Sequence, residues 1–212
     1  MTPQLKLALM ASALSLSAMM ALPANATIVL ADKSDFNGEE VIIDANVGDT
    51  GGTILGHTNQ SHVSITYDGM GDTLQVGGSG QSFLTGPGDG TLTQLSYYLT
   101  DDGTFNNTEF KISGATSTVD FTVVDNEGQV FNFPDLTIDS SGFVAFRGID
   151  GESISSVSFM VDNGGTFEEF RQLRLEVAPI PEPASWGMML GGFGMLGGLL
   201  RLRRSRENML SA

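Results

Sequence analysis

The amino-acid sequence predicts an all-β body, a β-sandwich with a jelly-roll-like order of strands, flanked by an N-terminal signal peptide and a C-terminal transmembrane helix. Three observations lead to this prediction. Between residues 27 and 178, apolar and polar residues alternate with a period of two, and no helical period is sustained. Clusters of Asp, Asn and Gly separate these runs, as turns separate the strands of a sandwich. Both ends of the chain carry apolar segments without charges.

The first 26 residues have the three parts of a secretory signal peptide. Lys6 supplies a positive charge, residues 7–22 are mainly apolar, and Ala24 and Ala26 occupy the small-residue positions that a signal peptidase requires. We therefore expect cleavage after Ala26, so that the exported protein begins at Thr27. A permanent N-terminal anchor helix is the alternative interpretation.

The body, residues 27–178, contains four clear alternating runs that each direct one face into a core. The apolar members of these runs are Val63, Ile65 and Tyr67; Val119, Phe121 and Val123; Val157, Phe159 and Val161; and Leu173, Leu175 and Val177. In the last run, Arg174 and Glu176 belong to the opposite face. Residues 46–56 and 76–90 are rich in Gly, Thr and Ser, which predicts long loops or edge segments there.

Composition limits the chemistry that this chain can perform. The 212 residues include no cysteine, which excludes disulfides, a thiolate nucleophile and a cysteine metal site. The formal net charge of −15 repels phosphate backbones, so we expect no nucleic-acid partner. The acidic surface favours solubility, with cation binding as the alternative.

No motif in the body points to an enzyme. The G-x-S-x-G elbow, the P-loop and the dinucleotide fingerprint are all missing from the sequence. Asp49-Thr50-Gly51 matches the triplet of aspartic proteases, but no apolar strand precedes it, so a turn is expected. The only histidines, His57 and His62, align on neither a helix face nor a strand face and are expected to be polar surface residues. We therefore predict a non-enzymatic protein without a cofactor.

Two weaker binding hypotheses remain open. Calcium prefers clustered oxygen donors on turns, although Asp in a turn commonly only accepts hydrogen bonds from its own backbone. The calcium candidates are Asp68 with Asp72, and Asp101 with Asp102. The aromatic candidates for a sugar-stacking surface are Tyr67, Tyr97 and Tyr98. Aromatic residues in strands more commonly fill a core, which is the alternative for these tyrosines.

The C-terminal segment, residues 179–212, combines a short motif, an apolar stretch and a basic end. Pro181-Glu182-Pro183 is followed by Trp186, and the expected transmembrane helix covers about residues 184–200. Four arginines follow the helix: Arg201, Arg203, Arg204 and Arg206. Because basic residues stay on the cytoplasmic side, this order directs the body outward.

This combination resembles the PEP-CTERM sorting signal, and in particular its variant with a Trp three residues after the Pro-Glu-Pro motif. The family occurs in Gram-negative bacteria that make extracellular polysaccharide. The resemblance implies processing by an exosortase, a membrane-embedded cysteine transpeptidase, with Pro181, Glu182 and Pro183 as recognition residues. This sequence departs from the variant at Gly187, where Ala is usual, and in its extension over residues 207–212. An ordinary membrane anchor is the alternative.

Together these features predict an exported protein that is held transiently in the inner membrane and then delivered to the cell surface or the extracellular matrix. The expected role is structural or adhesive, in association with exopolysaccharide, and the expected partners are an exosortase, the membrane and the polysaccharide. The alternatives are a secreted enzyme acting on polysaccharide and a calcium-dependent carbohydrate-binding module.

Overall fold

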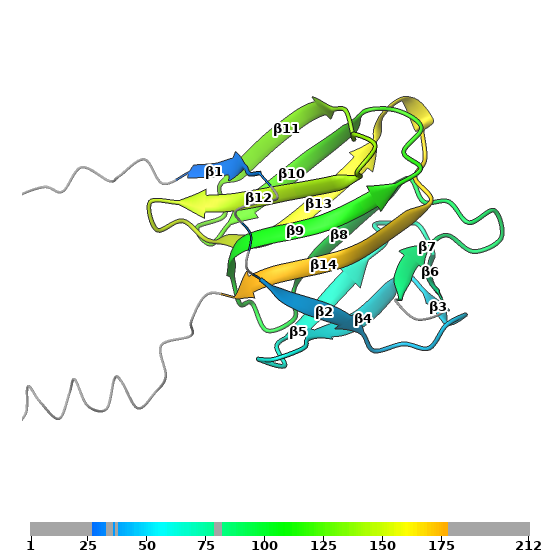
Figure 1. The fold of residues 1–212 in the computed structure, drawn as a ribbon, viewed down its shortest axis with the longest axis horizontal. Coiled ribbons are helices and arrows are strands. Elements are labelled where there is room, and N and C mark those ends of the chain that lie inside the picture. Colours follow the sequence, from blue (N-terminus) through cyan, green and yellow to red (C-terminus); the bar gives the residue numbers. More distant parts are fainter. Residues whose placement is uncertain (1–26, 33–35, 37, 79–81, 178–212) are drawn as a thin grey trace, which may run out of the picture.

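A computed structural model describes residues 27–32, 36, 38–78 and 82–177 of the chain (Figure 1). This part is all-β, with fourteen strands and one short 3₁₀ turn, η2 (Asp162–Gly164). The strands are β1 (Thr27–Leu30), β2 (Glu39–Ile43), β3 (Thr50–Gly51), β4 (Thr53–Thr58), β5 (Ser64–Asp68), β6 (Leu74–Gly77), β7 (Phe83–Thr85), β8 (Gln94–Leu99), β9 (Phe105–Ser113), β10 (Val119–Asp125), β11 (Val130–Leu136), β12 (Phe143–Ile149), β13 (Ile154–Val161) and β14 (Glu169–Val177). The prediction of an all-β body is confirmed.

Seven of these strands close into a ring in the order β9-β13-β8-β5-β4-β2-β14, and β14 pairs again with β9. The link from β9 to β13 is narrow, because only Phe105 and Ile154 pair there. The remaining strands extend the ring. β12 and β1 continue from β9, β10 and β11 continue from β13, and β7, β6 and β3 continue from β14. The body is therefore a barrel with additional strands.

The closed ring differs from the two separate sheets that the sequence led us to expect. In Figure 1, β12, β9 and β14 lie across the front of the molecule, with β10, β13 and β8 behind them. β2 joins these layers on one side, because it pairs with β14 on one edge and with β4 on the other. The jelly-roll order stays a prediction. No helix within the described ranges is long and apolar enough to cross a membrane, and residues 184–200 lie outside those ranges.

The predicted alternation matches the burial of the side chains. Phe121, Phe159 and Leu175 are each at most 2% exposed, while their sequence neighbours point away from the core. Residues 53–56 were expected to be part of a loop or an edge segment. They instead belong to β4, a ring strand whose Ile54 is buried, so that expectation was wrong for this stretch. Alternation was too short there to reveal the strand.

Phe110 of β9 occupies the centre of the core. Its ring centroid lies 5.9 Å from that of Phe159 on β13 and 5.3 Å from that of Phe170 on β14. Tyr97, Phe121 and Phe146 also surround it at centroid distances between 5.6 and 6.4 Å. Each such aromatic pair contributes roughly 0.5–1.5 kcal/mol beyond its buried area. The front and back layers are thus held together through one aromatic cluster.

β14 contains a β-bulge within the ring. Arg171 pairs with Lys111 and Arg174 with Glu109, so two residues of β14 stand opposite the single residue Phe110. Gln172, inside the bulge, has a φ of 55°, a left-handed value that is unusual for a non-glycine residue within a strand. The other edge of β14 pairs with β7 before the bulge and with β2 after it. The bulge thus marks the point at which β14 changes partners.

Candidate functional sites

The strand pairing defines two ends of the body. Val177, the last residue of β14, pairs with Phe105, and Phe105 pairs with Ile154. We call this the tail end, because the C-terminal segment follows Val177. At the opposite end, the far end, Val119 pairs with Val161. The order of strands therefore determines which side chains lie near Val177 and which lie near Val161.

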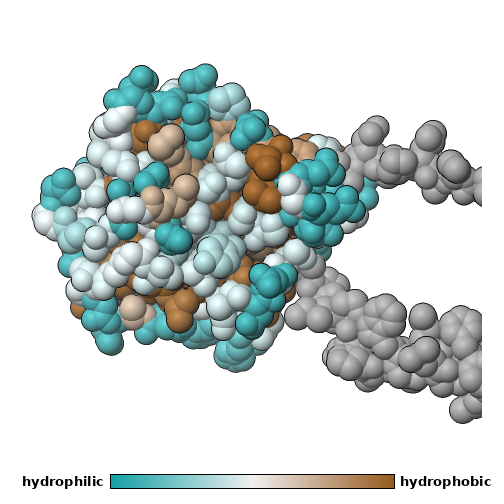
Figure 2. All heavy atoms as spheres, turned by 180° about the vertical axis from the view of Figure 1, so that it is seen from behind, coloured by the Kyte–Doolittle hydropathy of each residue, from teal (hydrophilic) through white to brown (hydrophobic). Residues whose placement is uncertain are grey.

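A groove of about 420 Å³ lies on the outer face of β11, β10, β13 and β8. Leu95, Phe121 and Phe159 point into the core, so the residues that alternate with them point outward. The polar side chains that line the groove are Gln94, Asp120, Thr122, Asn132 and Ser158, and the apolar ones are Met70, Phe121, Pro134, Phe159 and Met160. Figure 2, which views the molecule from behind, shows this face as mainly polar, with scattered apolar patches. Amide, hydroxyl and carboxylate groups are thus offered to one ligand.

Some of these groups are already hydrogen-bonded. Gln94 Nε2 donates to the carbonyl oxygen of Met70 at 2.7 Å, and Thr122 Oγ1 donates to Asn132 Oδ1 at 3.2 Å. Ser158 Oγ donates to the carbonyl oxygen of Thr122 at 3.3 Å. Since hydroxyl and amide groups can make more than one hydrogen bond, these contacts orient the side chains and leave acceptor and donor capacity toward the groove.

A cluster of three carboxylates adjoins the groove at the far end. Asp120, Asp135 and Asp162 each place one oxygen within 4.8 Å of the others. The backbone N–H of Asp135 donates to Asp120 Oδ1 at 2.8 Å, and Thr118 Oγ1 donates to Asp162 Oδ2 at 2.9 Å. Hard divalent cations such as Ca²⁺ prefer oxygen ligands of this kind. Asp120 belongs to both the groove and the cluster.

No local pattern in the sequence indicates this cluster. Its members come from β10, β11 and the turn after β13, and the pairing of Asp120 with Met160 brings the ends of these strands together. Asp135 stands at a φ of 56°, in the left-handed region, and its backbone N–H reaches Asp120 from there. A local reading cannot find residues that meet only through the pairing of strands.

Two of the predicted calcium residues accept hydrogen bonds from the protein, Asp68 within its own turn and Asp72 from a distant segment. Asp68 Oδ1 accepts a hydrogen bond from the backbone N–H of Met70 at 2.7 Å. Asp72 Oδ2 accepts from the backbone N–H of Thr93 at 2.7 Å and from its hydroxyl at 2.9 Å. Asp101 and Asp102 lie in the turn after β8, where Asp102 has a φ of 55°. Within the described ranges, the one group of three neighbouring carboxylates is the Asp120 cluster.

Two of the three tyrosines lie in the core. This agrees with the alternative that aromatic residues in strands fill a core and do not bind sugar. Tyr67 and Tyr97 are at most 2% exposed, so they cannot stack on a sugar. Burial raises the pKa of Tyr97, although the hydrogen bond between its hydroxyl and Thr108 Oγ1 lowers the pKa in part. Burial and the nearby charge of Asp44 raise the pKa of Tyr67. Tyr98 is half-buried on the outer face of β8.

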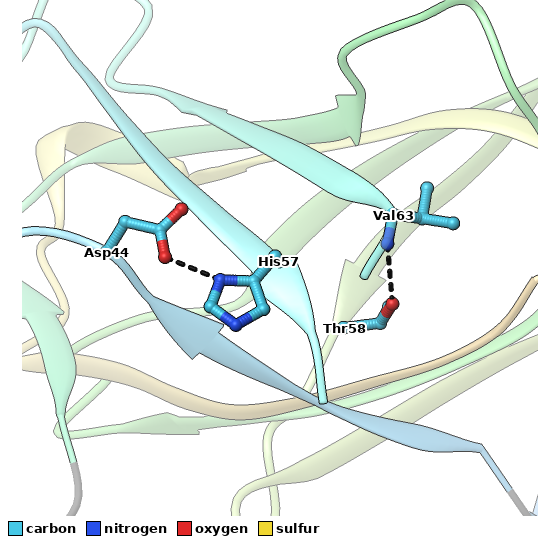
Figure 3. Close-up of polar contacts among 4 residues, drawn as sticks. All are labelled: Asp44, His57, Thr58 and Val63. Carbon is cyan, nitrogen blue, oxygen red and sulfur yellow. Dashed lines mark hydrogen bonds and ion pairs between the residues drawn. The ribbon is translucent and has the colours of Figure 1, made fainter. Parts of the chain in front are cut away.

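The two histidines meet although their spacing suggested no common face. His57 is on β4 and His62 lies in the turn before β5, and their ring centroids are 5.7 Å apart. Figure 3 shows His57 together with Asp44, whose Oδ1 lies 2.5 Å from His57 Nδ1. A hairpin reverses the chain, so residues five positions apart can face each other across it. The expectation that both histidines are polar surface residues is confirmed, whereas the contact between their rings was not predicted.

The sorting residues lie outside the described ranges. These are Ala24 and Ala26 at the expected cleavage site; Pro181, Glu182, Pro183 and Trp186 of the motif; and Arg201, Arg203, Arg204 and Arg206 of the basic end. A sequence comparison nevertheless identifies the C-terminal part of these residues. Residues 179–204 match the PEP-CTERM protein-sorting motif.

The chain carries a PEP-CTERM tail. The resemblance found in the sequence is confirmed over these residues. No curated protein and no solved structure matches the chain. A PEP-CTERM motif implies an exported protein with an exosortase-type processing partner and a transient membrane stage. The match begins two residues after the last residue of β14, Val177.

Proposed function

We propose that this protein is exported, cut in its PEP-CTERM tail by an exosortase and delivered to the extracellular matrix, where its body binds exopolysaccharide in a structural or adhesive role. The match of residues 179–204 to the sorting motif carries the first part of this proposal. The expected first residue of the exported chain, Thr27, begins β1 and pairs with Ile149. Cleavage after Ala26 and processing beyond Val177 would therefore leave all fourteen strands intact.

The groove supports the second part, because it combines polar side chains with apolar surface. Sugars are bound through hydrogen bonds to their hydroxyl groups and through contacts with their C–H faces. The groove offers the amides of Gln94 and Asn132 for the first, and Met160, which is 49% exposed, for the second. Since its groups belong to paired strands, the groove exists before a ligand binds, which reduces the entropy lost on binding. We propose that the body is not an enzyme.

The decisive experiment on sorting replaces Pro181-Glu182-Pro183 with a neutral Gly-Ser linker. We expect full-length protein to accumulate in the inner membrane, because processing requires the motif while membrane retention requires only the apolar stretch and the arginines. Cell fractionation and mass spectrometry of the released form measure this. If the released wild-type protein retains residues 187–212, the tail is a plain anchor and the proposal fails.

The groove is tested by a bulky substitution that leaves the core alone. Ser158→Tyr should abolish binding of the purified full-length protein to exopolysaccharide from the producing cells, measured by calorimetry. Ser64→Tyr is the matched control, since Ser64 is exposed on a ring strand and lies outside the groove, whereas Ser158 is partly exposed within it. Equal binding by the two variants would contradict the groove assignment while leaving the sorting proposal untouched.

A second candidate function is calcium-dependent sugar binding, favoured by Asp120, which lines the groove and belongs to the carboxylate cluster. In that case a chelator should abolish polysaccharide binding, and Asp135→Asn should have the same effect. Release of reducing sugar ends during the same assay would instead indicate a hydrolase, because paired carboxylates about 5–10 Å apart are the machinery of glycoside hydrolysis.

A further inference from the structure

The hairpin between β4 and β5 presents two imidazole rings side by side at the tail end. His57 points outward from β4, opposite Ser64 of β5. His62 has a φ of 55°, and this left-handed conformation places its ring beside that of His57. The rings are 5.7 Å apart between centroids and inclined by 33°. The only two histidines of the chain are thus neighbours.

Asp44 determines which nitrogen of His57 is free. Its Oδ1 lies 2.5 Å from His57 Nδ1, and both side chains are partly exposed. A carboxylate only accepts hydrogen bonds, so Nδ1 carries the hydrogen and donates it. In the neutral imidazole, Nε2 then holds the lone pair. This carboxylate–histidine arrangement is the one that orients metal-binding histidines in proteins.

The turn that carries His62 is held by hydrogen bonds before any ligand arrives. Glu39 Oε2 accepts from the backbone N–H groups of Gln60 and Ser61 at 3.1 and 2.8 Å. Thr58 Oγ1 accepts from the backbone N–H of Val63 at 2.9 Å, as Figure 3 shows. The backbone on both sides of His62 is therefore fixed, and little order remains to be imposed when a ligand binds.

The spacing of the rings suits a shared metal ion. With metal–nitrogen bonds of about 2.0–2.1 Å and tetrahedral to open angles, two imidazoles on one ion have centroids about 5–6 Å apart. The observed 5.7 Å falls in this interval. Imidazole nitrogen is a preferred ligand of Zn²⁺, Cu²⁺ and Ni²⁺, whereas Ca²⁺ prefers oxygen. The hairpin and the Asp120 cluster thus differ in the class of cation they suit.

We propose that His57 and His62 form a binding site for one divalent transition-metal ion, with Asp44 as a positioning residue that holds the His57 ring and its tautomer. Water fills the remaining coordination positions, because His62 is exposed and His57 is partly exposed. The site involves neither the groove nor the tail, so it stands or falls independently of the proposed function.

The test uses untagged, metal-free full-length protein in detergent at neutral pH. Zn²⁺ titrated by calorimetry should bind saturably at one ion per chain, and Cu²⁺ should give an electron paramagnetic resonance spectrum with imidazole nitrogen coupling. Asp44→Asn should weaken Zn²⁺ binding by about 10–100-fold, the usual effect of losing such a partner. His57→Gln and His62→Gln should each weaken binding more than that.

Two controls separate ligand loss from other causes. Thermal unfolding of the metal-free variants should match that of the wild type, because both histidine side chains lie at the surface. Asp135→Asn should leave Zn²⁺ binding unchanged, since the Asp120 cluster is at the far end. Absence of saturable Zn²⁺ binding, or equal affinity in the His57→Gln/His62→Gln double variant, would overturn the site. Unchanged affinity in Asp44→Asn would overturn the positioning role.

Discussion

The front and back faces of the body share one core but differ in their charged residues. All four lysines and arginines in the described ranges belong to β9, β12 and β14 on the front: Lys111, Arg147, Arg171 and Arg174. The outer face of β10, β13 and β8 carries none, and its far end gathers the three carboxylates of the Asp120 cluster. Charges on the front face can therefore neutralise one another, whereas those at the back need a cation or solvent. A positively charged ligand is therefore attracted more strongly to the back face than to the front face.

The largest effect should come from breaking the core on which both faces rest. We expect Phe110→Ala to destabilise the body by about 3–5 kcal/mol, because it opens a cavity among aromatic rings from both layers. Chemical denaturation of the full-length protein measures this. Leu55→Ala is the control, since Leu55 is 51% exposed and should change stability little. Equal effects of the two substitutions would show that Phe110 does not join the layers.

The sequence predicted which residues of a strand face the core but not which strands lie beside each other. Val119, Phe121 and Val123 reveal their common face through local alternation, which depends only on the backbone period. The change of partner along β14 occurs at the bulge at Gln172, where the period is broken by one residue. No composition signal marks this bulge, since the left-handed residue is not a glycine.

The candidate sites were missed for the same reason. Asp120 and Asp162 are brought together by strand pairing, and His57 and His62 by a hairpin turn. Neither relation is visible as a spacing along the chain. The sorting tail was predicted correctly because its motif is read as a linear sequence near a membrane. A linear motif can be recognised from the sequence alone, whereas these binding sites form only when the chain folds.

A second, smaller effect concerns the turn that presents His62. Burial tends to raise the pKa of Glu39, but hydrogen bonds from Ser61 and Gln60 outweigh it and lower the pKa below its ordinary value of 4.5. A lowered folded-state pKa stabilises the protein above the unfolded-state pKa, and this contribution is lost as the pH falls through the folded-state pKa. Glu39→Gln should therefore reduce stability at pH 7 and have less effect well below pH 4, as denaturation at both pH values measures. An equal loss at both would contradict the charge argument.

A smaller effect of opposite sign is expected on the back face. Asp135→Asn should stabilise the protein by about 0.5 kcal/mol in the presence of a chelator, because it removes one of three neighbouring negative charges. Added salt should reduce this gain by screening the repulsion in the wild type. Thermal unfolding at low and high ionic strength measures both changes. Destabilisation at low salt would mean that the cluster is not repulsive, and would weaken the contrast between the faces.

The smallest effect tests the front face. Arg171 Nη1 lies 3.2 Å from Glu169 Oε2, and both side chains are about one-third exposed. Glu169→Gln should destabilise the protein by less than about 1 kcal/mol, since exposed ion pairs contribute little. Removing any negative charge from a protein of net charge −15 also relieves general repulsion, so the measured value must be corrected for that gain.

Glu168→Gln supplies the correction, because Glu168 is exposed, has the same charge and makes no ion pair in the described structure. The difference between the two variants isolates the pair with Arg171. We expect Glu169→Gln to be less stable than Glu168→Gln at low salt and the difference to shrink at high salt, since screening weakens an attraction. High salt should thus reduce both the loss of stability in Glu169→Gln on the front face and the gain of stability in Asp135→Asn on the back face. If the two front variants are equally stable at low salt, the ion pair with Arg171 does not stabilise the protein. The difference in charge between the two faces would then cause no difference in stability.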